Sequence, residues 1–414
     1  MVNLKNILYI SPKFPALSLV FEQNEMLGIQ ANEVNITILS CREFSVFEIH
    51  HFTQSLLDKV FYPNYINALL GLILCLKKSP ISLFKVLIYT LVASANPFAI
   101  KKKLAALLFT LGWYAILADK TPAYDWIHAD FGQGTATVAL MLSELLKCPF
   151  SFKVHAFDIY DKSIQNFDLL KVIKIKQATK IFSAHEYGKH EILKMVSISE
   201  EKVITNYTSI RTNDFQPLSP VLESKRFVSL GRLVTKKGFS TLIKASNILH
   251  KKGEYFTVDI YGSGPEEANL MQLIEINGLQ DIVCLKGKYK NENLPDIFTD
   301  CIALVMPSIM DKNGDMDGIP TVIYEAMSLG RTVIASKISG ISEVVKDKEN
   351  GYLIEPGSFE ELAERMKYLL SHPEMSFQLG KEGRRLVEEN HEYKTNAKSL
   401  IESINKSLQA NSKN

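Results

Sequence analysis

The sequence lacks the cysteine patterns that mark disulfide-rich or zinc-binding proteins. Its cysteines form no CxxC pair and no Cys/His cluster, so neither a disulfide framework nor a zinc site is expected. They are Cys41, Cys75, Cys148, Cys284 and Cys301. Reduced thiols in a cytosolic protein are the simple interpretation. No Walker A, HExxH or GxSxG sequence is present, and no DxD-like acidic pair ends a strand, so a catalytic metal is not indicated.

Disorder and biased composition are also absent. Of the residues, 46% are apolar and 22% are charged, a composition that is ordinary for a globular protein. The length of 414 residues exceeds that of one domain of ~150 residues. The net charge of +2 carries no nucleic-acid signature. The opening residues MVNLKNILYIS lack a basic region followed by a long apolar stretch, and we expect them to form a first strand and not a signal peptide.

Acidic residues are nearly missing from one long segment. Lys59 to Lys120 holds eight lysines and one acid, Asp119, a net of +7, which leaves −5 for the rest. The same segment holds three apolar runs, each shorter than the ~18–20 residues of a transmembrane helix. The runs are Val60–Leu76, Val86–Ile100 and Leu104–Ala118. Two interpretations stay open: buried helices with solvated lysines, or a peripheral surface that meets anionic lipid. Lys101–Lys103 is expected to open a helix, where cations are disfavoured, which favours the second interpretation.

Short β-branched runs alternate with helical stretches through most of the chain, which predicts α/β architecture with doubly wound parallel sheets. The expected strands of the first half are Asn6–Ser11, Val34–Leu39, Asp125–Ala129, Phe150–Val154 and Lys180–Ser183. A polar stretch, Val203–Pro220, reads as a linker, and a second alternation begins at Arg226. We expect two Rossmann-like domains, residues 1–205 and 206–389, with a helix at about 390–414 packing back on the first. Ligands would bind in a cleft between the two sheets.

A basic loop, GRLVTKKG at 231–238, lies between a predicted strand and a predicted helix. A helix N-terminus attracts anions, Arg232 offers a planar fork for phosphate oxygens, and Lys237 adds a point charge. The alternative is a solvated basic turn. The loop therefore predicts a phosphate site.

A second motif, DGIPTVIYEAM, runs from Asp317 to Met327. Pro320 marks a helix start, which places Asp317 on the preceding loop and Glu325 about two turns inside the helix. Glu325 is the only charge between Gly318 and Gly330, and a buried carboxylate needs a partner. Ligand hydroxyls would serve, although a basic neighbour could replace them, and Asp317 could be a simple cap.

Two strand ends of the first half carry polar residues. His155 follows one strand and is expected to face the cleft, where it could donate to a sugar or phosphate oxygen, unless it is a structural histidine. His128 lies in the other strand and Asp130 and Gly132 follow it, and the period of two leaves open which side chain faces the cleft.

A weaker signal is the turn that contains Gly262 and Gly264, which is either part of a ligand site or a tight turn. A dinucleotide-dependent oxidoreductase is opposed by PKFPALS after the first strand, which has no glycine.

Together these motifs resemble retaining glycosyltransferases of family four, which have the GT-B fold. The resemblance covers nearly the whole chain and is strongest from Phe227 to Gly357, where GRLVTKKG, Pro307–Ser308 and DGIPTVIYEAM resemble the phosphate loop, the PS pair and the E-x7-E element. FPALSLVFEQNE, WIHADFG and KVHAFDIY look like the branch that builds colanic-acid-type exopolysaccharide and related surface glycans. Asp317 stands where the family usually has Glu, and Asp130 where this branch often has a second His.

The resemblance implies a role for each matching residue. Arg232 and Lys237 would bind the donor diphosphate together with the Gly318 and Ile319 amides, and Glu325 would bind the ribose. Asp317 would contact the donor sugar, and His155 would lie near the attacked carbon.

The resemblance also implies what the protein does. It implies a metal-independent hexosyltransferase with a nucleotide diphosphate sugar as its donor and no cofactor. The acceptor would be a lipid-linked or surface-polysaccharide glycan, as in exopolysaccharide or lipopolysaccharide synthesis. The protein would be cytoplasmic and peripheral at the inner face of the membrane. The alternative is a non-catalytic partner with the same fold.

Overall fold

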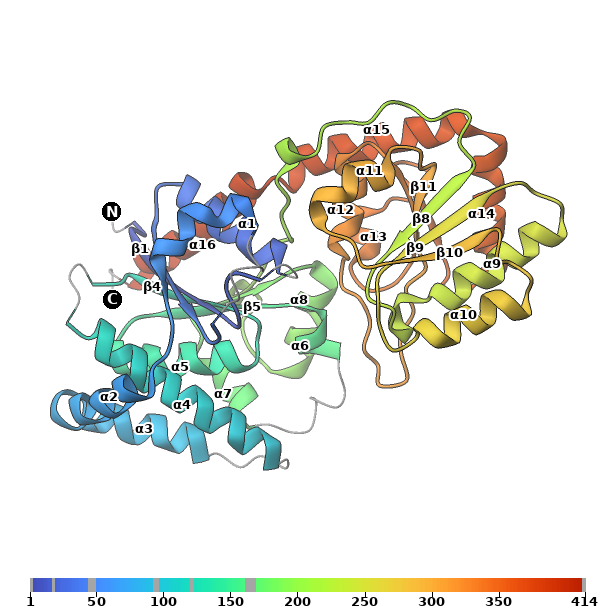
Figure 1. Cartoon of the computed structure of the whole chain (residues 1–414). Helices are drawn as coiled ribbons and strands as arrows, with labels where there is room; N and C mark the ends of the chain where they lie inside the picture. The colour runs from blue at the N-terminus through green and yellow to red at the C-terminus, as the bar shows by residue number, and fades with distance from the viewer. Residues whose placement is uncertain are drawn as a thin grey trace. The chain divides into compact units, whose positions relative to one another are not determined.

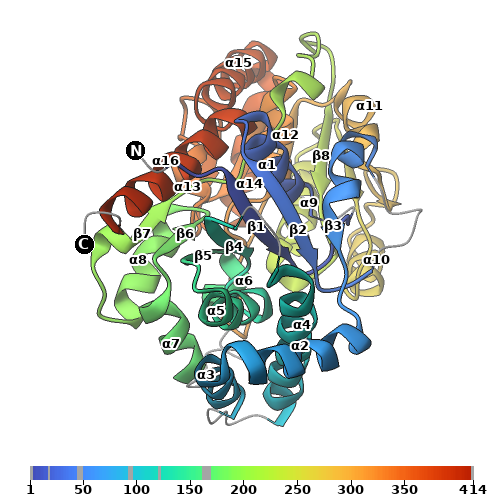
Figure 2. The same cartoon turned by 90° about the vertical axis from the view of Figure 1, so that its left-hand side faces the viewer.

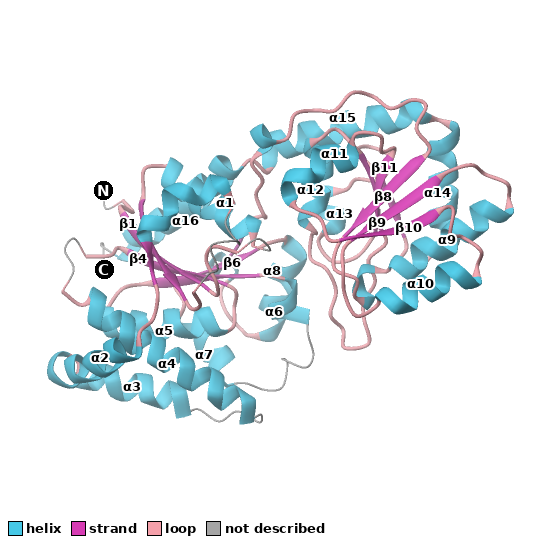
Figure 3. Cartoon of the chain, viewed as in Figure 1, coloured by secondary structure: helices cyan, strands magenta, loops and turns pink. Residues whose placement is uncertain are grey.

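The computed structural model describes residues 3–16, 19–43, 50–91, 97–119, 123–160 and 169–411. The chain divides into two compact units (Figure 1). Unit 1 comprises Met1–Ser209 and Tyr393–Asn414, and unit 2 comprises Ile210–Glu392. Each unit is built on one parallel sheet covered by helices, as the secondary-structure colouring makes visible (Figure 3).

The sheet of unit 1 has seven strands in the order β3-β2-β1-β4-β5-β6-β7. They are β1 (Asn6–Ser11), β2 (Asn35–Ser40), β3 (Val60–Phe61), β4 (Trp126–Asp130), β5 (Phe150–Val154), β6 (Lys180–Ser183) and β7 (Val203–Thr205). Strands β4 and β5 are buried at every position, which is typical of parallel strands covered on both faces. In the register, Tyr9 of β1 pairs with Ile38 on one side and with His128 on the other.

One face of this sheet is covered by α1 and α16, which pack on each other (Figures 1 and 2). Met26 and Ile29 of α1 join Leu400 and Ile404 of α16 in one apolar core with Ile7. The C-terminal helix thus completes the core of the unit that contains the N-terminus. The helices of unit 1 are α1 (Val20–Ala31), η2 (His51–Lys59), α2 (Tyr65–Lys78), α3 (Pro80–Leu91), α4 (Pro97–Leu117), α5 (Gly134–Leu146), α6 (Ala156–Tyr160), α7 (Leu169–Gln177), α8 (Glu186–Met195), η3 (Glu200–Lys202) and α16 (Tyr393–Asn411).

The basic apolar segment differs from its expected layout. Its first run begins with a strand, β3, before α2, and its second run spans the end of α3 and the start of α4. Helix α4 begins at Pro97, so Lys101–Lys103 lies beyond the first turn and does not open the helix. The interpretation of those lysines as cations at a helix start was wrong, because the helix extends N-terminally to a proline that suits a first position.

The sheet of unit 2 has six strands in the order β10-β9-β8-β11-β12-β13. They are β8 (Arg226–Leu230), β9 (Thr257–Tyr261), β10 (Val283–Gly287), β11 (Ala303–Met306), β12 (Thr332–Ser336) and β13 (Tyr352–Ile354). The helices are η4 (Thr212–Asp214), η5 (Thr235–Lys237), α9 (Phe239–Lys251), α10 (Glu267–Ile276), η6 (Asn291–Asn293), α11 (Leu294–Phe298), α12 (Thr321–Ser328), α13 (Ile341–Val344), α14 (Phe359–Ser371) and α15 (Pro373–Asn390). The prediction of two doubly wound parallel sheets is confirmed.

Candidate functional site

The topology of unit 2 points to one edge of its sheet. Strands run outward in sequence from β8 through β9 to β10 on one side, and from β11 through β12 to β13 on the other. The strand order therefore reverses between β8 and β11, and the crevice at the carboxyl ends of such strands is where doubly wound sheets bind ligands. The loops that leave this point are 231–238 and 307–320, the two segments that the sequence marks.

Charged side chains from these two loops meet. Lys237 Nζ lies 2.9 Å from Asp317 Oδ2, and the Ser308 hydroxyl donates to the same oxygen at 2.8 Å. Lys236 Nζ lies 2.8 Å from Asp315 Oδ2. Burial alone would raise the pKa of Asp317, but Lys237 and Lys236 lower it below its ordinary value. Asp317 is therefore a charged, buried carboxylate held by a lysine and is not the N-cap of α12.

This pairing joins two residues that the sequence predicted separately. Lys237 was expected on a diphosphate and Asp317 on a sugar, whereas the structure places them in one ion pair. Arg232, on the same loop as Lys237, is exposed to solvent. The guanidinium is thus the accessible cation of this loop, and Lys237 is one whose charge is shared with a carboxylate.

Glu325 lies on the buried helix α12. Burial raises its pKa to about 7, and a hydrogen bond from the Asn291 side chain opposes that rise. The pKa of Tyr289 is raised by burial and by the negative charge of Glu325. Asn291 and Tyr289 follow β10, so the carboxylate sits beside a second loop of the same sheet edge. The hydrogen-bond partner of Glu325 is thus the Asn291 side-chain amide and not the basic residue considered above.

The glycine turn after β9 packs directly on the loop after β8. Gly231 N–H donates to the Tyr261 carbonyl at 3.0 Å, and a Cβ at Gly262, where φ is +144°, would overlap the Gly231 carbonyl. A Cβ at Gly264 would likewise press on the Leu233 carbonyl. Both glycines therefore shape the basic loop from behind through close backbone approach.

The segment before α12 forms the other wall of this edge. Pro320 is the N-cap of α12 and supplies no side-chain capping hydrogen bond, and Gly318 and Ile319, half-buried, precede it. The first amides of a helix have no intrahelical acceptor and favour an anion. This arrangement is compatible with the predicted role of the Gly318 and Ile319 amides.

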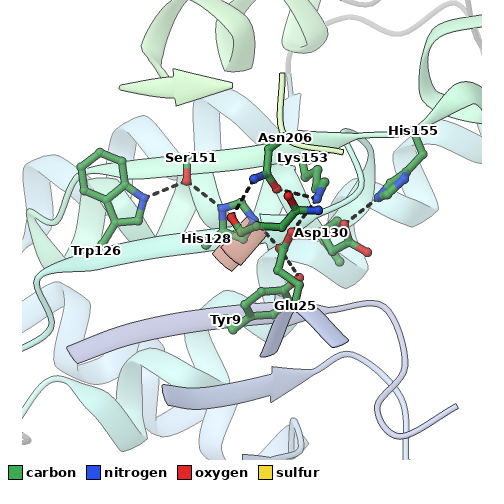
Figure 4. Close-up of polar contacts among 11 residues, drawn as sticks. Tyr9, Glu25, Trp126, His128, Asp130, Ser151, Lys153, His155 and Asn206 are labelled. Atoms are coloured by element: carbon green, nitrogen blue, oxygen red, sulfur yellow. Dashed lines mark hydrogen bonds and ion pairs between the residues drawn. The ribbon is translucent and has the colours of Figure 1, made fainter. Parts of the chain in front are cut away.

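Unit 1 contains a buried polar network that the sequence did not predict (Figure 4). Glu25 of α1 accepts from Lys153 Nζ at 2.6 Å and from the Tyr9 hydroxyl at 2.9 Å. Lys153 also donates to Asn206 at 2.8 Å. Burial would raise the pKa of Glu25, but Lys153 and His128 lower it well below its usual range. The network ties α1, β1, β5 and the segment after β7 together.

His128 belongs to this network. Its Nδ1 lies 2.8 Å from Ser151 Oγ, which accepts from the Trp126 indole at 2.7 Å, and its Nε2 lies 3.3 Å from Glu25. The His128 side chain is fully buried. The expectation of His128 as an acceptor-side group is therefore corrected to an internal one, because no accessible surface is left on the ring.

His155 and Asp130 form a second pair. His155 Nε2 lies 2.8 Å from Asp130 Oδ1 (Figure 4). The ring centroids of Phe21 and Phe131 each lie 4.8 Å from that of the imidazole. Asp130 itself is buried, so of the two only His155 retains exposed surface. Phe131 has φ of 69°, a conformation that costs of order 1–3 kcal/mol and clusters at functional sites. The Gly132 carbonyl accepts from Lys174 at 2.8 Å, so this residue lies against α7.

A third carboxylate lies near this pair. The Ser11 hydroxyl donates to Glu22 at 3.0 Å. Burial, and to a smaller extent the negative charge of Asp130, raises the pKa of Glu22 well above its ordinary value. Glu22 and Glu25 belong to a run of four consecutive polar residues in α1, all of them buried. That run was the available signal for the network: a helix with four adjacent polar positions must turn some of them inward.

Within the described ranges, no group of three or more His, Cys, Asp or Glu side chains is arranged to hold a metal ion.

Comparison with known families places this edge of unit 2 in context. Residues 210–386 match the family model of glycosyl transferases group 1. A colanic acid biosynthesis glycosyltransferase, WcaL, of Escherichia coli (strain K12) is 30% identical over 42% of this chain and 43% of its own length. The amylovoran biosynthesis glycosyltransferase AmsK of Erwinia amylovora is 36% identical over 33% and 34%. The chain thus spans less than half the length of these curated relatives.

Solved structures match almost the whole chain. Anabaena HepE, solved in complex with UDP, superposes with a TM-score of 0.68 at 16% identity, covering 97% of this chain and 99% of its own. Sucrose-phosphate synthase from Thermosynechococcus elongatus superposes with a TM-score of 0.74 at 16% identity, covering 98% and 100%. With its two Rossmann-like sheets, the chain has the GT-B fold.

The buried ion pair of unit 1 generates a stability prediction. Lys153→Met leaves Glu25 charged without its closest cation, and breaking a buried pair costs about 3–5 kcal/mol. Because the pKa of Glu25 is lowered in the folded state, its stabilisation is present above the unfolded pKa of ~4.3 and is lost as the pH falls through the folded value. Urea unfolding of unit 1 should show a large difference between wild type and variant at pH 7, and a smaller one in acid.

Lys194→Met is the matched control, because Lys194 pairs with Glu191 at an exposed site of the same unit. It should leave the unfolding midpoint unchanged. Equal midpoints for Lys153→Met and wild type at pH 7 would contradict the importance of the pair.

Proposed function

We propose that this chain, whose residues 210–386 form a glycosyl transferases group 1 domain and whose fold is GT-B, transfers a sugar from a nucleotide diphosphate sugar to a glycan acceptor with retention of configuration. The observation that carries the proposal is that the loop 231–238 and the segment before α12 meet at the β8/β11 edge, where Lys237 pairs with Asp317. Arg232 is exposed on that loop, and Glu325 is buried in α12. The family match of unit 2 and the UDP complex of a neighbour with this fold support it.

The site offers one partner for each part of such a donor. Arg232 and Lys237 bind the diphosphate, with the Gly318 and Ile319 amides at the start of α12 completing the phosphate site. Glu325 accepts hydrogen bonds from the ribose hydroxyls. Asp317 contacts the sugar once the diphosphate has drawn Lys237 away from it.

Transfer breaks the bond between the anomeric carbon and the diphosphate oxygen and forms a bond to an acceptor hydroxyl on the same face. The proton of that hydroxyl passes to the departing phosphate. Negative charge that builds on the diphosphate is stabilised by the preorganised cations and helix amides, without a resident metal or cofactor. We assign His155, which Asp130 holds, a role at the attacked carbon.

The acceptor we propose is a lipid-linked or surface-polysaccharide glycan of exopolysaccharide or lipopolysaccharide synthesis, and the donor sugar is a hexose. The similarity to WcaL and AmsK, named for colanic acid and amylovoran biosynthesis, supports this class. We place the protein in the cytoplasm, in peripheral contact with the inner face of the membrane. The lysine excess of 59–120 supports that location. No helix in the described ranges is both long and apolar enough to cross a bilayer.

The donor site predicts stabilisation by one nucleoside diphosphate. In a thermal unfolding panel of UDP, GDP, ADP, CMP and NAD, the cognate diphosphate at ~100 times its Kd should stabilise unit 2 by about 2.7 kcal/mol. Arg232→Ala should abolish the shift, because the exposed guanidinium is the accessible cation of the loop. Arg385→Ala removes an exposed arginine of the same unit and should leave the shift intact.

The panel also separates the alternatives. A shift from NAD alone would support an oxidoreductase. Silence from every nucleotide would contradict the donor site.

Glu325 predicts a pH-dependent affinity for that nucleotide. Hydroxyl donors bind the ionised carboxylate, whose pKa in the unliganded protein is about 7. The affinity should therefore rise about tenfold between pH 6 and pH 8, with proton release on binding. Calorimetric titration across this range measures the slope. Glu325→Gln should bind weakly with the slope of the nucleotide alone, and an unchanged slope in that variant would exclude Glu325 from the contact.

His155 predicts a defect in turnover without a defect in donor binding. Release of the nucleoside diphosphate from its sugar conjugate should fall about 10²-fold in His155→Ala, the scale for loss of one group at a reacting centre. Asp130→Asn should lose less, because Asp130 acts only by holding the imidazole. His190→Ala, an exposed histidine of unit 1, is the control. Donor binding with no release in the wild type, even with membrane extract added, would favour the non-catalytic partner.

A further inference from the structure

Three helices of unit 1 present an apolar surface to solvent. Of the 23 exposed large apolar side chains in the described residues, 13 lie on α2, α3 and α4 between Ile66 and Leu108. They recur every three or four residues, so each helix contributes one continuous face. Ile66, Leu69, Ile73, Ile81, Phe84 and Leu91 are representative. We call this surface the α2–α4 face.

The α2–α4 face is not core left over from folding. The same helices bury a different set of residues, such as Cys75, Val86 and Trp113, on their inner sides. A Cβ at Gly71 of α2 would overlap the Leu111 carbonyl of α4, so the two backbones are in close contact. Both views draw α2, α3 and α4 together on the side of unit 1 away from α1 and α16 (Figures 1 and 2). The face is therefore held outward by tight helix packing.

A surface helix of a globular protein normally turns charged or polar residues outward. Helix α3 instead exposes Ile81, Phe84 and Leu91 around a single exposed lysine, Lys85. Contiguous apolar surface on this scale marks an interaction site.

The charge around the face selects its partner. No Asp or Glu occurs between Asp58 and Asp119, and Lys77, Lys78, Lys85 and Lys102 are exposed on the three helices. Two of these cations have an acid nearby, since Lys78 pairs with Asp119 and Lys85 Nζ lies 3.3 Å from Glu144. A second copy docked by the same face would bring like charges together, whereas an anionic bilayer attracts lysines and accepts apolar side chains.

We propose that the α2–α4 face docks on an anionic lipid bilayer, with its apolar side chains among the acyl chains and its lysines at the headgroups. The helices then lie along the membrane interface. This agrees with the finding that no helix among the described residues is long and apolar enough to cross a bilayer. The docking proposal rests on the proposed function only for the role of docking, which is to hold unit 1 at a lipid-linked acceptor. The docking itself depends on the α2–α4 face alone.

Vesicle flotation tests the docking in the absence of any nucleotide. The full chain should float with phosphatidylcholine vesicles that contain phosphatidylglycerol, and much less with phosphatidylcholine alone. Ile81→Ser with Phe84→Ser should weaken binding at least about tenfold, because burial of each side chain contributes more than the 1.4 kcal/mol that equals a tenfold change. These side chains are 76% and 65% exposed, so the fold should survive.

The matched control replaces two equally exposed apolar residues of unit 2. Tyr255 and Ile276 are 82% and 73% exposed, and Tyr255→Ser with Ile276→Ser should bind vesicles as the wild type does. Lys77→Gln with Lys102→Gln should weaken binding to anionic vesicles and leave binding to neutral vesicles unchanged.

Three outcomes would overturn the proposal. The first is that the wild type does not float with anionic vesicles, and the second is that wild type and Ile81→Ser/Phe84→Ser float equally. The third is that the wild type sediments as a dimer and this double variant does not, because the face would then pair two copies. A normal thermal shift with the nucleoside diphosphate in a chain that fails to float would remove the docking and leave the proposed function standing.

Discussion

Parallel strand pairing organises both units of this protein. Every strand pairing in the described parts of the two sheets is parallel. Each connection must then cross from the carboxyl edge back to the amino edge, so the loops that leave the strands gather along one edge of each sheet. Reversal of strand order between β8 and β11 separates two of those loops enough to admit a ligand. The basic loop and the segment before α12 are candidates for ligand binding because they lie at this position.

Burial of charge is the second theme, and both units handle it in the same way. Asp317 is held by Lys237, and Glu25 is held by Lys153. A buried carboxylate without such a cation shifts its pKa upward, as Glu325 and Glu22 do. The paired carboxylates stay charged and fix local geometry, whereas Glu325 remains sensitive to whatever donor approaches it. A ligand with hydroxyl donors would stabilise the ionised form of Glu325, which no lysine or arginine pairs with among the described contacts.

The polar network of unit 1 and the α2–α4 face show two different uses of helix amphipathicity. Helix α1 turns polar residues inward, where β1 and β5 supply their partners. Helices α2 and α3 turn apolar residues outward and keep a second apolar face for packing. Each is the opposite of the usual pattern, and each follows from what the neighbouring surface offers. In the same unit His155 is held separately, by Asp130 and by the rings of Phe21 and Phe131.

Much of the architecture was predictable because it is local. Strand and helix periods are written in consecutive residues, and the predicted strands at 6–11, 150–154, 180–183 and 226–230 coincide with β1, β5, β6 and β8. The start of α4 was misplaced because residues 86–100 are apolar through the end of one helix and the start of the next, so periodicity could not separate them. The positions of Arg232 and Lys237 after a strand, of Asp317 before a helix and of Glu325 inside that helix also followed from pattern alone.

The two parallel sheets, the loops at their carboxyl edges and the residue types in those loops could thus be predicted from consecutive residues. Which of those residues touch depends on how the elements pack together. The tertiary structure paired Lys237 with Asp317, buried His128 against Glu25, and backed His155 with Asp130. These contacts, together with that between Lys153 and Glu25, join residues 25 to 128 positions apart in the chain, and no spacing rule encodes them. The physical reason is that hydrophobic period specifies which way a side chain points from its own strand or helix, while its partner is set by the register and packing of the elements beside it.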